Sequence, residues 1–136
     1  ELQMNTTLNT AAQANLKAAL KYYDAMQAKD FDTMASYLGD EICLISPLAE
    51  INGKEEVLTA AKNFGGMLKE IHIRSKFADN NQVMLAYDMI VPEPIGKFRA
   101  AALMDFRNNK ITRIELFYDA RAFEMKKDDI FSGVEK

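Results

Sequence analysis

Asp88 is the side chain of this sequence that is best placed for acid–base chemistry, because it interrupts an otherwise apolar run at 83–91. A carboxyl group that a strand turns into an apolar cavity loses hydration and can act as a general acid or base. With the opposite strand register, Asp88 is exposed or paired with Arg99 across a hairpin, because a shift of one residue reverses every side chain. The residues alone leave both interpretations open.

His72 is the single histidine, and an imidazole is a common proton shuttle. It alternates with Arg74 and Lys76, while Ile71 and Ile73 take the other face, so we expect His72 at the surface. It has no second histidine, and no cysteine or glutamate at ligand spacing, so no metal site is predicted. The sequence also lacks a Ser-His-Asp set, a phosphate loop and a dinucleotide fingerprint, and no cofactor is expected.

The composition fits one globular domain. The 136 residues, 49% apolar and 27% charged, are enough for one core and too few for two. The net charge of −3 and the scattered Lys and Arg provide no basic face, so nucleic acid is not an expected partner. No apolar run approaches the ~18 residues of a membrane span. The lone Cys43 indicates a reducing, cytoplasmic location; a trimmed secreted form is the alternative to Met4 as the native start.

Three helices are expected in the first half of the chain. Thr10–Gln13 has the form of a capping box, so the first helix should begin there. Asp30 or Asp32 caps a second, short helix, which Gly39 is expected to end in a left-handed conformation. The pair Asn52–Gly53 starts a third helix. Each helix has one apolar face that must cover another element.

The second half of the chain has the pattern of strands. After a short strand at 42–47, four apolar segments (71–77, 82–91, 97–106 and 110–123) are separated by turns rich in Asn, Asp and Pro. This order predicts an α+β domain with an antiparallel meander. The strands are apolar on both faces, so the helices should cover one face and a second copy of the chain the other. We therefore expect a homodimer through the sheet.

The order and spacing of several short motifs resemble the NTF2-like superfamily, in its SnoaL-like and ketosteroid-isomerase-like branch. The motifs are Tyr22-Tyr23, Lys29-Asp30-Phe31, Tyr37-Leu38, Asp40-Glu41, Ser46-Pro47, Asn52-Gly53-Lys54 and the hairpin at 105–119. The resemblance covers about residues 10–122. It implies a cystatin-like α+β cone, with N-terminal helices on a curved, mainly antiparallel sheet, usually dimeric and holding a small hydrophobic molecule. One domain should span 1–136, with 1–9 and 124–136 as flexible ends.

The chemistry of the isomerases transfers only in part. In them a tyrosine and a protonated carboxylic acid form an oxyanion hole, and an aspartate moves the proton. By the resemblance, Tyr22 matches the tyrosine, but Ser46 stands in place of the base and Ala101 in place of the acid. Steroid isomerisation is therefore not expected. The resemblance also directs Asp88 toward the cavity, where it could carry the proton instead.

Two functions remain open from the sequence. The first is a cofactor-independent isomerase or cyclase for an apolar carbonyl compound, with Tyr22 as hydrogen-bond donor and Asp88 as proton carrier. The second is a non-catalytic ligand-binding or dimerisation module of the same fold, which the missing base favours. The residues expected to line the ligand site are Met26, Ser46, Phe64, Met67, Ile90, Arg99, Ala101, Leu103, Ile114, Leu116 and Tyr118. They indicate an apolar ligand without identifying it.

Overall fold

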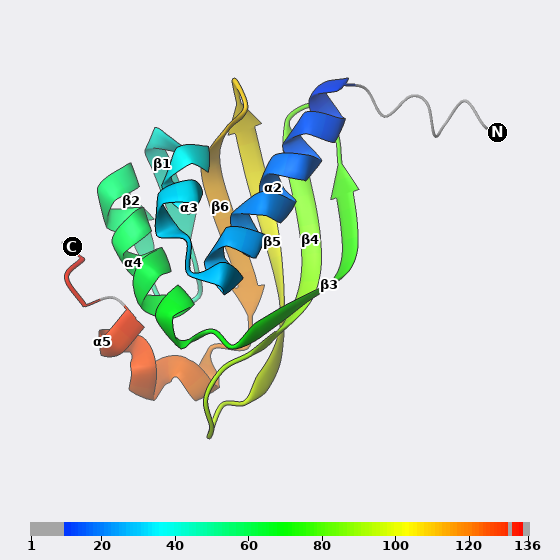
Figure 1. Ribbon diagram of the computed structural model, residues 1–136. Coiled ribbons are helices and arrows are strands. Elements are labelled where there is room, and N and C mark those ends of the chain that lie inside the picture. Colours follow the sequence, from blue (N-terminus) through cyan, green and yellow to red (C-terminus); the bar gives the residue numbers. More distant parts are fainter. Residues whose placement is uncertain (1–9, 131, 135–136) are drawn as a thin grey trace.

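The computed structural model describes residues 10–130 and 132–134 (Figure 1). The helices are α2 (Thr10–Ala28), α3 (Phe31–Tyr37), α4 (Lys54–Met67), the 3-10 helix η1 (Arg121–Lys126) and α5 (Lys127–Ile130). The strands are β1 (Leu38–Ile45), β2 (Glu50–Asn52), β3 (Glu70–Ala78), β4 (Gln82–Ile90), β5 (Lys97–Arg107) and β6 (Lys110–Tyr118). The range 1–9 lies outside the described residues, whereas much of 124–136 is helical.

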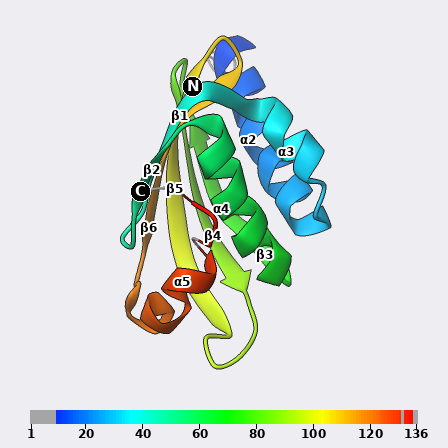
Figure 2. The same cartoon turned by 90° about the vertical axis from the view of Figure 1, so that its left-hand side faces the viewer.

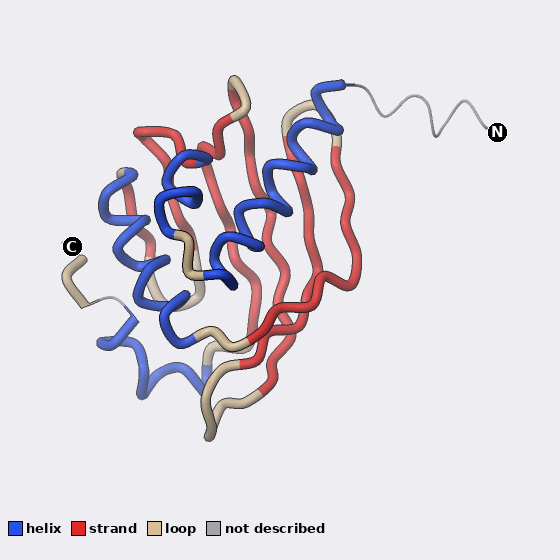
Figure 3. Tube along the Cα trace, in the orientation of Figure 1, coloured by secondary structure: helices blue, strands red, loops and turns tan. Residues whose placement is uncertain are grey.

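The strands form one six-stranded sheet in the order β2-β1-β6-β5-β4-β3. The neighbours from β3 to β6 are antiparallel, which confirms the predicted meander. Strand β1 joins β6 in parallel, and the short β2, which the sequence analysis did not predict, pairs with β1. The sheet is therefore mixed and open, and Figure 3 shows its curvature around the helices. The predicted α+β cone is confirmed.

The helix boundaries follow local capping chemistry. Helix α3 begins after Asp30, whose side chain accepts a hydrogen bond from the Thr33 N–H at 3.2 Å. The prediction for Gly39 is wrong, because the helix already ends before Leu38, which is extended, and Gly39 lies within β1. Helix α4 begins after Gly53, whose φ of 96° falls in the region that favours glycine.

Helices α2, α3 and α4 lie on one side of the sheet (Figure 2). The alternation along β4 turns Leu85, Tyr87 and Met89 toward the helices, and Ala86 and Asp88 toward the opposite side. No described helix covers that opposite side, which we call the uncovered face. Within the same described part of the chain, no helix has the length and hydropathy needed to span a membrane.

Candidate functional site

A cavity of about 90 Å³ lies between the helices and the covered face of the sheet. Its walls come from α2, β1, α4, β4, β5, β6, η1 and α5. They consist of Tyr22, Tyr23, Met26, Leu44, Ser46, Val57, Ala60, Ala61, Phe64, Tyr87, Met89, Phe98, Ile114, Leu116, Tyr118, Phe123 and Ile130. The volume is below the ~300–1,000 Å³ of pockets for drug-sized ligands, so the cavity fits a small guest.

The polar side-chain groups in this wall are the hydroxyls of four tyrosines and one serine. Among the described residues, none that lines the cavity carries a formal charge at neutral pH. A charged guest would lose its hydration here without gaining an opposite charge, which is energetically unfavourable. The cavity therefore selects uncharged, mainly apolar molecules.

Three tyrosines meet where α2 crosses β4. The rings of Tyr22 and Tyr23 pack edge to face at 5.3 Å, and the rings of Tyr23 and Tyr87 are 5.2 Å apart. The hydroxyls of Tyr23 and Tyr87 share a hydrogen bond of 3.3 Å. Burial raises the pKa of all three phenols well above the ordinary value, and the proximity of the rings adds to this for Tyr22 and Tyr23. The three therefore remain neutral and can donate hydrogen bonds.

Tyr22 differs from the other two because its hydroxyl has no hydrogen-bond partner within the described part of the chain. The hydroxyl is also not among the described polar atoms that are both fully enclosed and unpaired. It therefore keeps some contact with open space, and the space that Tyr22 borders is the cavity. A buried donor of this kind is best satisfied by an acceptor on a bound guest.

Ser46 and Tyr118 form the polar part of the opposite wall. The Ser46 hydroxyl accepts hydrogen bonds from the N–H groups of Leu48 (3.2 Å) and Ala49 (3.1 Å) and donates to the Ala49 carbonyl (3.1 Å). Ser46 therefore holds the turn after β1. Burial raises the pKa of the Tyr118 phenol, an effect that the neighbouring Ser46 hydroxyl partly offsets. Neither group can act as a base near neutral pH.

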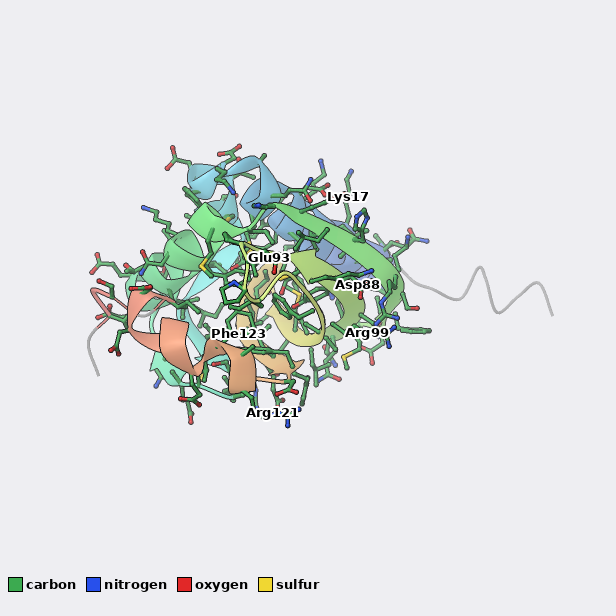
Figure 4. The ribbon with its side chains drawn as sticks, turned by 90° about the horizontal axis from the view of Figure 1, so that it is seen from below. Lys17, Asp88, Glu93, Arg99, Arg121 and Phe123 are labelled. Atoms are coloured by element: carbon green, nitrogen blue, oxygen red, sulfur yellow. The ribbon has the colours of Figure 1, made fainter. Side chains whose placement is uncertain are left out.

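One end of the cavity is closed by the C-terminal segment, which we define as residues 121–134. Phe123 is 1% exposed and packs edge to face on Phe98 at 4.8 Å and on Tyr118 at 5.4 Å. Asn63 on α4 donates hydrogen bonds of 2.9 Å to the carbonyls of Ile130 and Ser132. The segment is thus held by a buried aromatic side chain and one side-chain amide. Figure 4 shows Phe123 under the sheet, on the strip formed by η1 and α5.

The structure brings together just over half of the residues expected at the site. Tyr22, Met26, Ser46, Phe64, Ile114, Leu116 and Tyr118 line the cavity. Met67 does not; it packs beside the cavity against the cluster of Leu48, Phe123 and Ile130. That these residues bind a ligand stays a prediction.

The expectation that Asp88 faces the cavity is wrong. It lies on the uncovered face, because the alternation along β4 gives the cavity to its neighbours Tyr87 and Met89. Its carboxylate is 3.1 Å from Arg74 Nε and 3.7 Å from Lys97 Nζ. The opposite register, which the sequence left open, is the one present, and Asp88 has no access to a guest in the cavity.

The same register moves four other predicted residues away from the cavity. Ile90, Arg99, Ala101 and Leu103 lie on the uncovered face with Asp88, because β4 and β5 pair with Asp88 opposite Arg99. Figure 4 shows Asp88 and Arg99 together, at a distance from Phe123. Their expected role as cavity lining is therefore wrong.

The sequence analysis missed Tyr87, Met89, Phe98, Phe123 and Ile130 as lining residues. A signal for the first two was present, since their face of β4 contains no charged residue and the opposite face contains Asp88. A buried charge is costly, so the uncharged face is the one that helices should cover. No local pattern marks Phe123, because its position depends on how the chain returns under the sheet.

The remaining ionisable candidates are at the surface. His72 is exposed, as predicted, with its Nε2 2.7 Å from a Glu70 carboxylate oxygen. Asp119 is exposed, and hydrogen bonds from Arg121 lower the pKa of its carboxyl to about 2. Within residues 10–130 and 132–134, no three His, Cys, Asp or Glu side chains gather closely enough to hold a metal ion.

Comparison with known proteins places this fold and cavity in a family. The family model described as the SnoaL-like domain matches residues 19–114. The chain belongs to the SnoaL-like family. The resemblance inferred from the short motifs is thereby confirmed. No curated protein matches this SnoaL-like chain significantly in sequence.

Several solved structures share the fold of this SnoaL-like protein. A protein from Kribbella flavida is 27% identical with a TM-score of 0.78, over 86% of this chain and 93% of the other. An NTF2-like protein of Cytophaga hutchinsonii is 18% identical with a TM-score of 0.71 (80% and 93%). An LEH-like epoxide hydrolase of M. tuberculosis is 22% identical with a TM-score of 0.70 (90% and 92%). At 18% and 22% identity, the last two show the fold alone.

Proposed function

We propose that this SnoaL-like protein binds a small, uncharged, apolar molecule with one hydrogen-bond acceptor, such as a cyclic ketone, without transforming it. The observation that supports this most is the cavity of about 90 Å³, whose described lining contains no charged side chain. Apolar walls with few polar groups are typical of small-molecule sites. The buried phenol of Tyr22 supplies the single directed contact.

Binding is favoured over acid–base catalysis because no described lining residue can exchange a proton near neutral pH. Isomerase and cyclase chemistry needs a general base or acid whose pKa lies near the working pH. The phenols in the wall have pKa values raised by burial, and Ser46 is not a base. Asp88 is excluded by its position on the other face. The missing base therefore supports the non-catalytic alternative.

The test uses cyclohexanone as the probe. Titration of the protein should shift the methyl NMR signals of Met26 and Met89, which lie on opposite walls of the cavity. Cyclohexanecarboxylate, which has a similar ring and a charge, should leave both signals in place. Absence of a shift up to the solubility limit of cyclohexanone, or an equal response to the carboxylate, would contradict the proposal.

Two further measurements separate binding from catalysis. Tyr22→Phe should weaken cyclohexanone binding about fivefold, which corresponds to one neutral hydrogen bond of ~1 kcal/mol, and should leave methylcyclohexane binding unchanged. In D2O, the wild-type protein should not accelerate exchange of the protons next to the cyclohexanone carbonyl. Accelerated exchange that depends on Tyr22 would show a catalytic site instead.

We also propose that the protein forms a homodimer through the uncovered face. Large apolar side chains are exposed there, including Phe77 at 68% and Phe117 at 45%. Apolar patches of this kind on a sheet usually mark an interaction surface. Light scattering after size-exclusion chromatography should give twice the 15.4 kDa mass at micromolar concentration; a monomer would contradict the dimer.

A further inference from the structure

The uncovered face has an apolar band between two charged rows. The strand register places Ala86, Ala101 and Phe117 side by side across β4, β5 and β6. The next row contains Met84, Leu103 and Glu115, which are cross-strand partners in the same way. These two rows form the apolar band, in which Glu115 is the only charged member among the six. The rows beyond it, at Asp88 and Arg99 and at Gln82 and Asp105, are polar.

Strand β5 carries this pattern in a symmetric form. Arg99, Ala101, Leu103 and Asp105 point to the uncovered face, and the two charged ends are equally far from Ala102. At ~3.3 Å per residue the charged ends are about 20 Å apart. An apolar centre with opposite charges at equal distances is suited to contact with a reversed copy of itself.

Both charged ends lack a partner of opposite charge. No described residue forms an ion pair with Arg99; the neighbouring Asp88 is engaged by Arg74 at 3.1 Å and Lys97 at 3.7 Å. Asp105 accepts a hydrogen bond of 2.8 Å from the neutral Gln82 amide, and no described cation lies within ion-pair distance of it. One unpaired cation and one unpaired anion are thus presented on each copy of the face.

We propose that two copies associate through this face with their β5 strands antiparallel, so that Arg99 of each copy pairs with Asp105 of the other. This inference rests on the proposed homodimer and adds its orientation. A two-fold axis that relates two facing sheets lies in the plane between them. An axis across β5 at Ala102 reverses the strand, so position 99 faces 105 and position 101 faces 103.

The charges exclude the other simple orientation. An axis parallel to the strands would keep each position opposite itself, and would place Arg99 on Arg99 and Asp105 on Asp105. Like charges in contact oppose association, and opposite charges favour one partner and one register. Facing sheets are usually rotated by about 30°, and the long Arg99 side chain can span that offset. The antiparallel orientation is therefore the one that the charges support.

The test compares charge reversals at the two ends. Arg99→Glu and Asp105→Arg each create two like-charge contacts in the proposed dimer, so each should raise the dimer dissociation constant by at least about tenfold at low salt. The double variant restores opposite charges and should return the constant to within about threefold of wild type. Sedimentation equilibrium measures all four proteins, and circular dichroism checks that each is folded. Lys17→Glu, on the exposed side of α2 in Figure 4, reverses a charge away from the face and should have no effect.

The outcomes separate the dimer from its orientation. A wild-type protein that stays monomeric at about 100 times the expected micromolar constant would overturn both. A wild-type dimer in which the double variant is no tighter than the single variants would overturn the antiparallel orientation alone. Arg99→Ala provides an independent check: it should weaken the proposed dimer, and a tighter dimer would instead show the strand-parallel axis.

Discussion

The two faces of the sheet are both apolar, but they treat charge differently. On the covered face, Tyr87 and Met89 border a cavity whose described lining contains no formal charge. On the uncovered face, one residue away along β4, Asp88 is 9% exposed and forms ion pairs with Arg74 and Lys97. The difference shows that the apolar character of a strand locates burial, whereas the position of charge shows which face the helices cover. The covered face is suited to holding a neutral guest, and the uncovered face to association.

The largest effect should come from truncating matched leucines on the two faces. Leu85→Ala removes a side chain that is 0% exposed under the helices, and should lower the free energy of unfolding by about 4 kcal/mol. Leu103→Ala acts on the partly exposed apolar band and should cost less than about 1.5 kcal/mol in the monomer. Its main effect should be weaker dimerisation. Urea unfolding at low protein concentration, together with sedimentation, measures both quantities. Equal costs in the monomer would mean that the two faces are equally buried.

A smaller effect is expected from the aromatic side chain that closes the cavity. Phe123→Ala should cost about 3 kcal/mol, at the low end for a buried phenylalanine, because the C-terminal segment can detach without unfolding the sheet. The enlarged cavity should then bind the two-ring ketone 1-decalone, which wild type should not. Phe117→Ala, on the uncovered face, is the control and should not change ketone selectivity. If wild type and Phe123→Ala bind 1-decalone equally, Phe123 does not limit the size of the guest.

The fold could be predicted from the sequence because its signals are local. Asp30 caps a helix, and Asn108 and Asn109 adopt the positive φ values of a tight hairpin turn, 52° and 65°; both interactions lie within a few residues. The parallel pairing of β1 with β6 could not be predicted, because no local pattern connects segments about 70 residues apart.

The candidate site was less accessible for a physical reason. Which face of β4 the helices cover depends on packing across the whole sheet, and both faces are apolar enough to be buried. The charge of Asp88 was the deciding signal, and the analogy with the isomerases directed it the wrong way. Phe123 lies beyond residue 114, where the match to the SnoaL-like domain ends, so the family resemblance could not locate it either.

The covered face should also be sensitive to alkali. Burial raises the pKa of Tyr22, Tyr23 and Tyr87, so the folded state retains these protons above about pH 10, where the unfolded chain releases them. The stability is therefore complete below pH ~10 and falls as the pH rises further, by about 1.4 kcal/mol per pH unit for each phenol. Tyr23→Phe should make this decline shallower by one such increment. Urea unfolding between pH ~10 and ~11.5 measures the slopes, and identical slopes would show that Tyr23 titrates alike in both states.

The smallest effect is expected at Asp88, and it tests the division between the faces most directly. Asp88 Oδ1 is close to Arg74 Nε, but the geometry does not make an aligned hydrogen bond, so the oxygen is compensated by charge alone. Arg74 and Lys97 are substantially exposed and can be hydrated if the carboxylate is lost. Asp88→Asn keeps the shape and should therefore change the free energy of unfolding by less than about 1 kcal/mol, as for surface ion pairs. Cyclohexanone should bind this variant as it binds wild type. A loss of ketone binding in a variant of unchanged stability would connect Asp88 to the cavity and remove the distinction between the two faces.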